Sequence, residues 1–392
     1  MALTVQQQAI QNQINAFDSN TGTQLLLSTL LQAINVGDVR QGYADSAAFP
    51  TDSAFIGMIG FDDFDSSLRF VGRDLVAHKI DSADIVVSGG GASGPIAYAG
   101  TNVYVYHDDL QKFNMTSSSN AAVVITGPFF PGQSREASGG RSSTHGYFAG
   151  GGVPSATNTV YRFPFAAEDA LSDTTADLTQ VRYAANLDTI GDGLFNYVAG
   201  GFNPGIGSVD TIDKYPTSNT SNATDVGNLT DSRYSVTGQS SSTHGYRSGG
   251  LNPSTQGTNI IDKFAFAADG NATDVGDTTL ARGAGGGASS TTHGYQHGGI
   301  HIGPPVARYN RIDKFAFASD GNATDVGDLT GTDHDNSGGS SSTHGFRLGG
   351  SAGTPTGSTD IEKWSFSSDE NASDVADLTE NVKQAGTAHD TA

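Results

Sequence analysis

The chain repeats itself with a period of about fifty residues. A repeat constrains the fold more than any local pattern, because each unit must stack on a neighbour to bury its apolar face. A weaker first copy has Tyr98-Ala99-Gly100 as its first element and Leu110–Phe113 as its second, which makes six recognisable units. The five clearer copies carry double glycines that fall 49 to 51 residues apart, at Gly150-Gly151, Gly200-Gly201, Gly249-Gly250, Gly298-Gly299 and Gly349-Gly350.

The cleanest copy shows what one unit contains. It runs from Ser241 to Gly250, continues through a variable loop to Ile261–Ala267, and ends with Asp269–Asp277. A unit of this length accommodates four short strands, and a period near fifty with a double glycine is typical of a kelch-type propeller blade. We therefore predict a mostly β chain with a kelch-like β-propeller over residues 85–392.

The next copy predicts the strands of a blade. Residues 285–290 are small and suit the innermost strand, where blades converge, and His293-Gly294 suits a tight turn because glycine tolerates positive φ. Residues 295–298 would form the second strand. Residues 311–318 alternate like a pleated third strand with apolar groups on both faces, and residues 323–329 would form the outer edge strand.

Composition excludes several classes of protein. The chain has 41 acidic and only 20 basic residues, a formal charge of −21, which disfavours nucleic-acid binding. It contains no cysteine, so disulfides and cysteine-ligated zinc are excluded. Residues 1–13 lack the pattern of a signal peptide, and the apolar stretch 25–31 is too short to span a bilayer. We expect a soluble protein that does not use the usual secretory route.

Residues 1–40 are predicted to be a helical attachment segment. Ile10, Ile14 and Phe17 follow the spacing of one helical stripe within residues 4–17, and a second amphipathic helix is expected over residues 23–35. Two short helices cannot bury their apolar faces alone. They would dock either on partner subunits or within the chain.

Residues 41–84 allow two interpretations. The alternation in Phe55–Phe61 and Leu68–Gly72 predicts a small β-hairpin module, but Phe61–Phe64 also resembles a decayed Ile-Asp-Lys-Phe, which would make this a partial propeller blade. The C-terminal Gln384–Asp390 resembles the start of a further unit. It would complete a blade begun at Phe55, giving seven blades, or overlay residues 85–91, giving six. Seven is preferred because it leaves no strand unpaired.

Two repeated residue sets could hold metal ions. The histidines of the Ser-Thr-His-Gly motif would form a partial ring, yet symmetry-related blade positions lie too far apart to share one ion, so a turn-capping role is the simpler interpretation for His145, His244, His293 and His344. The acidic turn offers oxygen ligands for calcium, but its spacing is not that of an EF-hand loop, so an Asx-turn is the preferred interpretation. The residues are Asp269, Asn271, Asp274 and Asp277, and again Asp320, Asn322, Asp325 and Asp328. We predict no cofactor, with calcium as the alternative.

No motif indicates catalysis. Gly349–Gly353 matches Gly-x-Ser-x-Gly in letters but lacks the strand-to-helix turn that a nucleophile elbow needs. The kelch-type copper-radical oxidases need a cysteine crosslinked to tyrosine, and the chain has none. An active site would also require some blades to diverge, whereas the copies are nearly identical. The chain is predicted not to be an enzyme.

The amino-acid sequence of the repeat resembles that of a known family. Ser241–Tyr246, Ile261–Ala267 and Asn271–Asp277 resemble the kelch-like repeats of virion structural proteins from tailed phages of marine bacteria, cyanophages especially. The resemblance implies a component of the tail, tail fibre or capsid surface, assembled in the host cytoplasm. It also implies that the N-terminal helices bind other virion proteins and that the chain is a homo-oligomer. The acidic charge and the shortness of the apolar stretch predict that the chain binds no nucleic acid and inserts into no membrane.

The loops that differ between copies are where contacts with a host-surface glycan or protein would lie, because loops on a rigid frame carry recognition. Two other classes remain open: a surface-layer or filament-forming cell-surface protein, and a carbohydrate-binding lectin or carbohydrate-active enzyme. The candidate receptor-contact residues are Leu251, Asn252, His301, Arg308, Tyr309 and Thr354.

Overall fold

The computed structural model describes residues 101–390, apart from 118, 127–135, 153–154, 185–189 and 354–355, and four short strands nearer the N-terminus. The chain divides into two compact units, Met1–Gly94 and Pro95–Ala392. Every element in the described part of the chain is a strand, and no helix there is long and apolar enough to cross a membrane.

The first unit holds a small sheet of its own. Its strands are β1 (Arg40–Tyr43), β2 (Ile59–Asp62), β3 (Ser67–Val71) and β4 (Ala77–Lys79). Strands β2 and β3 form the antiparallel hairpin expected from the alternation of apolar residues, but β1 pairs with β2 in parallel, unlike any strand pair of the propeller. This sheet is therefore not a blade. The helices expected over residues 4–17 and 23–35 lie outside the described residues.

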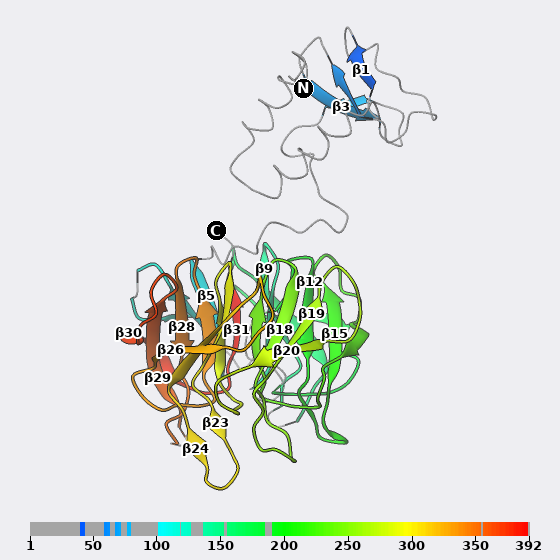
Figure 1. The fold of residues 1–392 in the computed structure, drawn as a ribbon. Coiled ribbons are helices and arrows are strands. Elements are labelled where there is room, and N and C mark those ends of the chain that lie inside the picture. Colours follow the sequence, from blue (N-terminus) through cyan, green and yellow to red (C-terminus); the bar gives the residue numbers. More distant parts are fainter. Residues whose placement is uncertain are drawn as a thin grey trace. The chain divides into compact units, whose positions relative to one another are not determined.

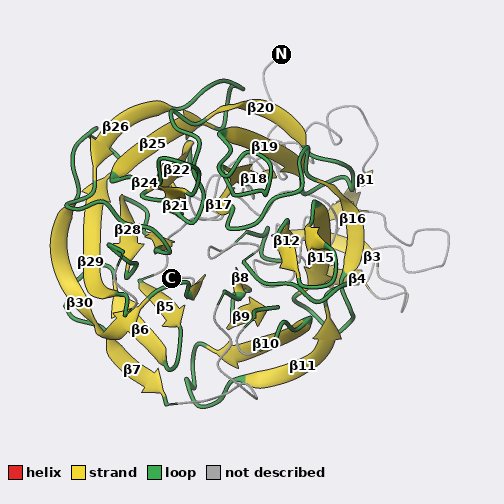
Figure 2. Ribbon diagram, turned by 90° about the horizontal axis from the view of Figure 1, so that it is seen from below, coloured by secondary structure: helices red, strands yellow, loops and turns green. Residues whose placement is uncertain are grey.

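The second unit is a six-bladed β-propeller (Figures 1 and 2). We number its blades 1 to 6 and give the strands of each from the centre outward. Blade 1 contains β31 (Gly386–His389), β5 (Asn102–Tyr106), β6 (Leu110–Asn114) and β7 (Ala122–Ile125), and blade 2 contains β8 (Ser138–Arg141), β9 (His145–Ala149), β10 (Thr159–Pro164) and β11 (Ser172–Asp177). The described strands of blade 3 are β12 (Phe195–Ala199), β15 (Thr211–Pro216) and β16 (Thr224–Asn228).

The other three blades each have four strands. Blade 4 contains β17 (Thr237–Ser240), β18 (His244–Ser248), β19 (Ile260–Ala265) and β20 (Thr273–Asp277). Blade 5 contains β21 (Gly286–Ser289), β22 (His293–His297), β25 (Arg311–Ala316) and β26 (Thr324–Asp328). Blade 6 contains β27 (Ser337–Ser340), β28 (His344–Leu348), β29 (Ser358–Ser365) and β30 (Ser373–Val382).

The C-terminal strand closes the ring, so the preferred seven-blade interpretation is wrong. Strand β31 pairs antiparallel with β5 from the other end of the sequence, with Gly386 opposite Tyr106 and His389 opposite Val103. Beyond it, the N–H of Asn102 donates to Oδ1 of Asp390 at 2.9 Å. The C-terminus thus supplies the inner strand of blade 1, as the six-blade alternative required, although on β5 rather than on residues 85–91, which lie outside the described residues.

Inside a blade, most predicted strands are present, but one turn is misplaced. Residues 293 and 294 begin strand β22, and the turn precedes them at residues 290–292. Gly294 is needed for space rather than for positive φ, because a Cβ there would lie 2.4 Å from the ring of Phe315. The inner strands are equally tight, since a Cβ on Gly338 would lie 1.8 Å from the carbonyl oxygen of Gly287.

The hydrophobic core lies between neighbouring blades. Tyr246 of blade 4 packs on Phe315 and Phe317 of blade 5, with ring centroids 5.5 and 4.8 Å away. Equivalent pairs repeat around the ring, such as Tyr295 with Phe366 at 4.8 Å. Apolar groups on both faces of the third strand, expected from the sequence, serve this packing.

The antiparallel strands give the propeller two different faces. The face we call the turn face carries the short turns between first and second strands and also both ends of the described propeller segment, where the N–H of Asp390 donates to the carbonyl oxygen of Asn102 at 3.2 Å. The opposite face, which we call the loop face, carries the connections between second and third strands and the linkers between blades. It includes the projecting hairpin of β23 (Ile300–His301) and β24 (Ala307–Arg308), seen at the bottom of Figure 1.

Candidate functional site

In blades 2 to 6 the double glycine starts the loop between the second and third strands and ties it to the frame. Gly298 and Gly299 have φ of 61° and 103°, in the left-handed region where glycine carries no steric penalty. The N–H of Gly299 then donates to the carbonyl oxygen of Asp333 in the next linker at 2.7 Å, and Gly250 makes the same bond to Arg282 at 2.9 Å. The base of each loop is therefore fixed, and the residues beyond it are free to differ.

Beyond this base the loops take different forms. Blade 3 has a short hairpin of β13 (Phe202–Asn203) and β14 (Gly207–Ser208), and blade 5 has the longer β23–β24 hairpin. In blade 4 the loop is a turn in which Oδ1 of Asn252 accepts the N–H groups of Ser254 and Thr255 at 3.0 and 2.7 Å. Neighbouring loops also touch, because the N–H of Ile302 donates to the carbonyl oxygen of Gln256 at 3.1 Å.

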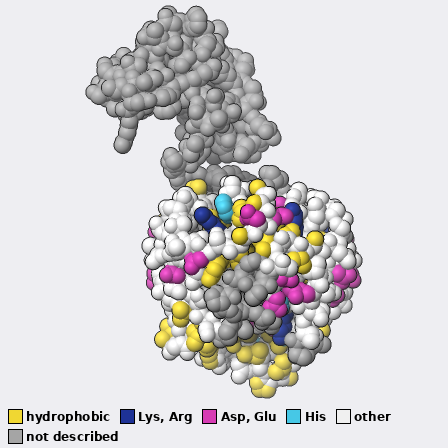
Figure 3. Space-filling view, turned by 180° about the vertical axis from the view of Figure 1, so that it is seen from behind, with side chains coloured by type: hydrophobic (Ala, Val, Ile, Leu, Met, Phe, Trp, Pro, Cys, Tyr) yellow, Lys and Arg dark blue, Asp and Glu magenta, His cyan; other side chains and the backbone are white. Residues whose placement is uncertain are grey.

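Aliphatic side chains are exposed at the tips of these loops. On the loop face the exposed fractions are 73% for Ile206, 58% for Val306, 39% for Val181 and 38% for Ile302. Only two other large hydrophobic residues are exposed in the described part of the chain, Leu194 and Val123. Figure 3 shows hydrophobic side chains gathered at the end of the propeller where the loops project. The loop face therefore concentrates the exposed apolar surface.

The predicted receptor-contact residues separate into two groups. Leu251 and Asn252 are buried, and the amide of Asn252 donates to Oδ2 of Asp231 at 2.7 Å, so both hold the loop in place. Arg308 is exposed, and His301 and Tyr309 are half-buried. Thr354 lies outside the described residues. The sequence did not single out the aliphatic tips, of which Ile206 and Val306 are the two most exposed large hydrophobic residues described.

The repeated histidines belong to turns. Nδ1 of His244 lies 2.8 Å from Oγ1 of Thr243, and Oγ of Ser241 accepts the N–H of His244 at 3.0 Å. The same arrangement recurs at His145, His293 and His344. Burial and a neighbouring basic side chain, Lys263 in this copy, lower the pKa of His244. The turn-capping interpretation accounts for all four residues.

The acidic turn that suggested calcium directs its oxygens to separate partners. Oδ1 of Asn271 accepts the N–H of Asn228 in the preceding blade at 3.0 Å, and Oδ1 of Asp274 accepts the N–H of Gly276 at 3.1 Å. Oδ1 of Asp269 pairs with Nζ of Lys214 of the preceding blade at 2.8 Å. Within the described residues, Asn271 and Asp269 therefore link their blade to the preceding one, and Asp274 forms an Asx-turn.

Buried ion pairs join successive blades, a feature that sequence reasoning missed. Nη2 of Arg233, in the linker before blade 4, lies 2.8 Å from Oδ2 of Asp262 on β19, and both side chains are fully buried. Thr230 also donates its hydroxyl and N–H to the same carboxylate, at 2.6 and 3.0 Å. The signal was an Arg about thirty residues before the Asp of the third strand, repeated as Arg182 with Asp213 and Arg282 with Asp313.

Blade 6 keeps the acid but changes its partner. Glu362 stands at the position of Asp262, and Arg347 of β28 pairs with it at 2.6 Å. Asp333 takes the place of the linker arginine and also contacts Arg347. The ion pair is thus rearranged without being lost.

The junction between blades 6 and 1, where the ring closes, is built differently. Gln111 replaces the aspartate and Val382 the arginine, while the N–H of Thr379 still donates to Oε1 of Gln111 at 2.7 Å. His107-Asp108 stands in the position of the double glycine, directly after β5. The loop of this blade is correspondingly short, since β6 begins at Leu110. The first element expected at residues 98–100 lies outside the described residues.

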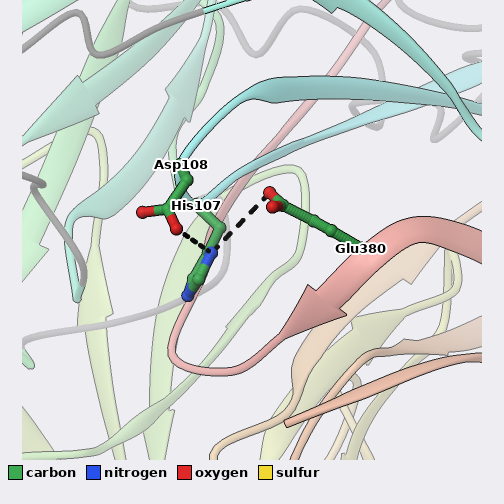
Figure 4. A group of neighbouring side chains, drawn as sticks. All are labelled: His107, Asp108 and Glu380. Atoms are coloured by element: carbon green, nitrogen blue, oxygen red, sulfur yellow. Dashed lines mark ion pairs between the residues drawn. The ribbon is translucent and has the colours of Figure 1, made fainter. Parts of the chain in front are cut away.

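Three side chains of this junction approach one another (Figure 4). Nδ1 of His107 lies 3.6 Å from Oδ2 of Asp108 and 3.8 Å from Oε1 of Glu380 on β30. Burial, and then the nearby Asp108 and Asp109, raise the pKa of Glu380. In the described part of the chain this is the one group of three or more His, Cys, Asp or Glu side chains whose ligand atoms all lie within 4.8 Å of one another. The propeller therefore offers two candidate sites, the loop face and this cluster.

Comparisons with known proteins add no family: no family model matches this chain, and no curated protein matches it.

Proposed function

We propose that this chain is a structural component of a phage particle, in the tail, a tail fibre or the capsid surface, and that it displays its propeller to bind the host surface. The observation that carries the proposal is the separation of the two faces. The frame repeats almost unchanged, while the loops differ and open on the face opposite to the two ends of the described propeller segment. The proposal assigns no catalytic role to the propeller.

The position of the chain ends suits display. The polypeptide enters the described ring at Thr101 and leaves it at Asp390, and the bonds between Asn102 and Asp390 keep both ends on the turn face. An anchor within residues 1–40, the segment that would bind other virion proteins or further copies, would therefore hold the propeller by its turn face. The loop face would then point outward.

The chemistry of the loop tips favours a protein as the partner. Glycan sites commonly present aromatic rings for stacking, whereas Ile206, Val306 and Ile302 are aliphatic. Burying one such side chain in an interface contributes about 1.5–3 kcal/mol. Two or three tips buried together would supply a useful share of a micromolar affinity, which corresponds to about 8 kcal/mol. We therefore assign the loop face to a host-surface protein.

The binding test uses the full chain, fluorescently labelled, on host cells. We expect saturable binding that competes with adsorption of the phage. The double variant Ile206→Ser/Val306→Ser should bind at least tenfold more weakly while melting at the same temperature. Leu194→Ser is the matched control, because Leu194 is 51% exposed but lies in a turn of the opposite face.

Two further treatments identify the partner and the location. Protease treatment of the cells should abolish binding, and periodate oxidation of their glycans should not; the reverse result would assign the face to a glycan. Immunogold labelling should place the chain on the outside of the particle. Unchanged binding and adsorption with the double variant, or a particle without this chain, would refute the proposal.

A further inference from the structure

We propose that His107, Asp108 and Glu380 bind one divalent transition-metal ion of the zinc class, which joins blades 6 and 1 where the ring closes. His107 and Asp108 come from the turn between β5 and β6, and Glu380 comes from β30 of the last blade. An ion held by all three would connect the two ends of the sequence. This inference is independent of the loop-face proposal.

The distances suit shared coordination better than direct hydrogen bonding. The Nδ1–oxygen separations of 3.6 and 3.8 Å exceed the length of a hydrogen bond. Two ligand atoms that each lie about 2.0–2.1 Å from a tetrahedral zinc ion are about 3.3–3.4 Å apart. A movement of a few tenths of an ångström would therefore bring each carboxylate to that spacing from the histidine nitrogen, and all three ligand atoms already lie within 4.8 Å of one another.

The donor set selects the class of ion. One imidazole nitrogen with carboxylate oxygens suits zinc, cobalt or manganese, whereas calcium and magnesium prefer oxygen ligands alone. The histidine is 5% exposed, and the side chains of Asp108 and Glu380 are about one-third exposed, at 33% and 32%. The nitrogen ligand is thus fixed in the interior, while the ion can enter from the loop face and keep an open position for water.

The charges and supports of the cluster also suit a cation. The carboxylates of Asp108 and Glu380 both lie near the histidine, and a divalent ion would offset the repulsion between their like charges. The Glu380 carboxylate accepts backbone hydrogen bonds from Asp108 and Asp109, and Nε2 of Gln111 lies 3.4 Å from its Oε1. The ligands are therefore oriented by the fold before an ion arrives.

At this junction the third-strand acid has become neutral and the linker arginine is missing. Blade 2 also lacks the third-strand acid, since Tyr161 stands at that position. Gln111 and Val382 replace the charged pair, and His107-Asp108 replaces the double glycine. The residue that follows the linker threonine differs in each copy, with Glu380 here and Gln180, Asp231, Leu280 and Gly331 in the others. None of the three ligands is thus demanded by the repeated frame. A metal ion would supply the cross-blade attraction that the ion pair provides at blades 3 to 6.

Metal binding is tested on the untagged full chain after treatment with a chelator. Titration calorimetry with zinc should show one site per chain. The affinity should fall at least tenfold in His107→Ala and in Glu380→Gln, whereas His145→Ala, a half-buried turn histidine, should bind like the wild type. Cobalt should give a visible absorption spectrum in the wild type that is lost in Glu380→Gln.

The joining role has a separate readout. Zinc should raise the melting temperature of the wild type and slow hydrogen exchange in β5 and β31, because an ion that binds only the folded state stabilises it. Neither effect should occur in Glu380→Gln. This partly exposed residue decides the matter even if His107→Ala does not fold. Absence of stoichiometric zinc, cobalt or manganese binding, binding that both variants retain, or binding without protection of β5 and β31 would overturn the proposal.

Discussion

Replacing Arg233 by methionine should lower the free energy of unfolding by about 3–5 kcal/mol, because it leaves the carboxylate of Asp262 charged and buried without its counter-ion. The two side chains are fully buried and 2.8 Å apart. The hydrogen bonds from Thr230, at 2.6 and 3.0 Å, remain but supply no positive charge. Asp262→Asn should cost a similar amount, since it leaves the guanidinium unpaired.

The double variant Arg233→Met/Asp262→Asn separates charge from packing. It removes both charges, and the carboxamide introduced by Asp262→Asn can still accept the bond from Thr230, so its cost should be smaller than that of either single change. The ring already contains a neutral version at its closure, where Gln111 accepts from Thr379 at 2.7 Å and Val382 replaces the arginine. We expect a coupling free energy of at least about 2 kcal/mol.

The assay is thermal and urea unfolding of the full chain and its three variants. At about 2 °C per kcal/mol for a chain of this size, each single change should lower the melting temperature by about 6–10 °C. Lys263→Met is the surface control, because its partner Asp320 is 56% exposed and such pairs contribute about 1 kcal/mol or less. If the double variant lost as much as the two single variants together, the reasoning about the buried pair would be refuted.

Three further predictions concern the centre of the ring. Burial and nearby arginines lower the pKa of His297 and His389 to about 3, so both are neutral in the folded chain. Their contribution to the free energy of unfolding is complete above about pH 6.5 and falls by up to about 1.4 kcal/mol per histidine for each pH unit toward the folded pKa. Urea unfolding from pH 7.5 to 4.5 should therefore show a weaker dependence of the free energy of unfolding on pH in His297→Leu than in the wild type. Gly338→Ala should cost more than about 3 kcal/mol or prevent folding, because its Cβ would lie 1.8 Å from the carbonyl oxygen of Gly287; an unchanged melting temperature would contradict this. A chain that ends at Val382 should lose β31 and expose the edge of blade 1 to hydrogen exchange; protection equal to the full chain would show that β31 does not close the ring.

Much of the fold could be predicted because the residues of each repeat indicate its strands locally, without reference to distant parts of the chain. The small residues 285–290 give the inner strand β21, and the alternation of residues 311–318 gives β25. The number of blades could not be predicted in the same way. The number of blades depends on which strand the C-terminal strand pairs with, and this pairing joins the two ends of the propeller sequence. The pattern of residues 386–389 is compatible with several partners.

Glycine was ambiguous for a physical reason. The sequence cannot distinguish a glycine needed for positive φ from one needed for space. Gly299 is of the first kind, with φ of 103°, and Gly294 is of the second kind, against the ring of Phe315. Both recur in every clear copy or nearly so, and only the packing of the neighbouring strand separates them.

The candidate binding face was located by divergence between copies, but its exposed aliphatic residues were not. Hydrophobic character suggests burial, and Leu251 is indeed buried, yet Ile206 and Val306 at equivalent loops are the two most exposed large hydrophobic residues described. The difference lies in the position within the loop. Leu251 directly follows the double glycine and forms a β-bridge with Tyr234, whereas Ile206 and Val306 lie between the two strands of their hairpins.

The closing cluster shows how departures from a repeat become informative once the register is known. His107 and Glu380 lie near opposite ends of the described propeller sequence, and only the pairing of β31 with β5 brings their blades together. In that register, His107 replaces a glycine and Val382 an arginine at positions where most other copies agree. A frame residue changes without penalty only if its neighbours change too, and here the neutral Gln111 accompanies the loss of the arginine. Substitutions that coincide across one junction therefore mark it as specialised, whereas isolated differences within a loop mark only a surface that is free to vary.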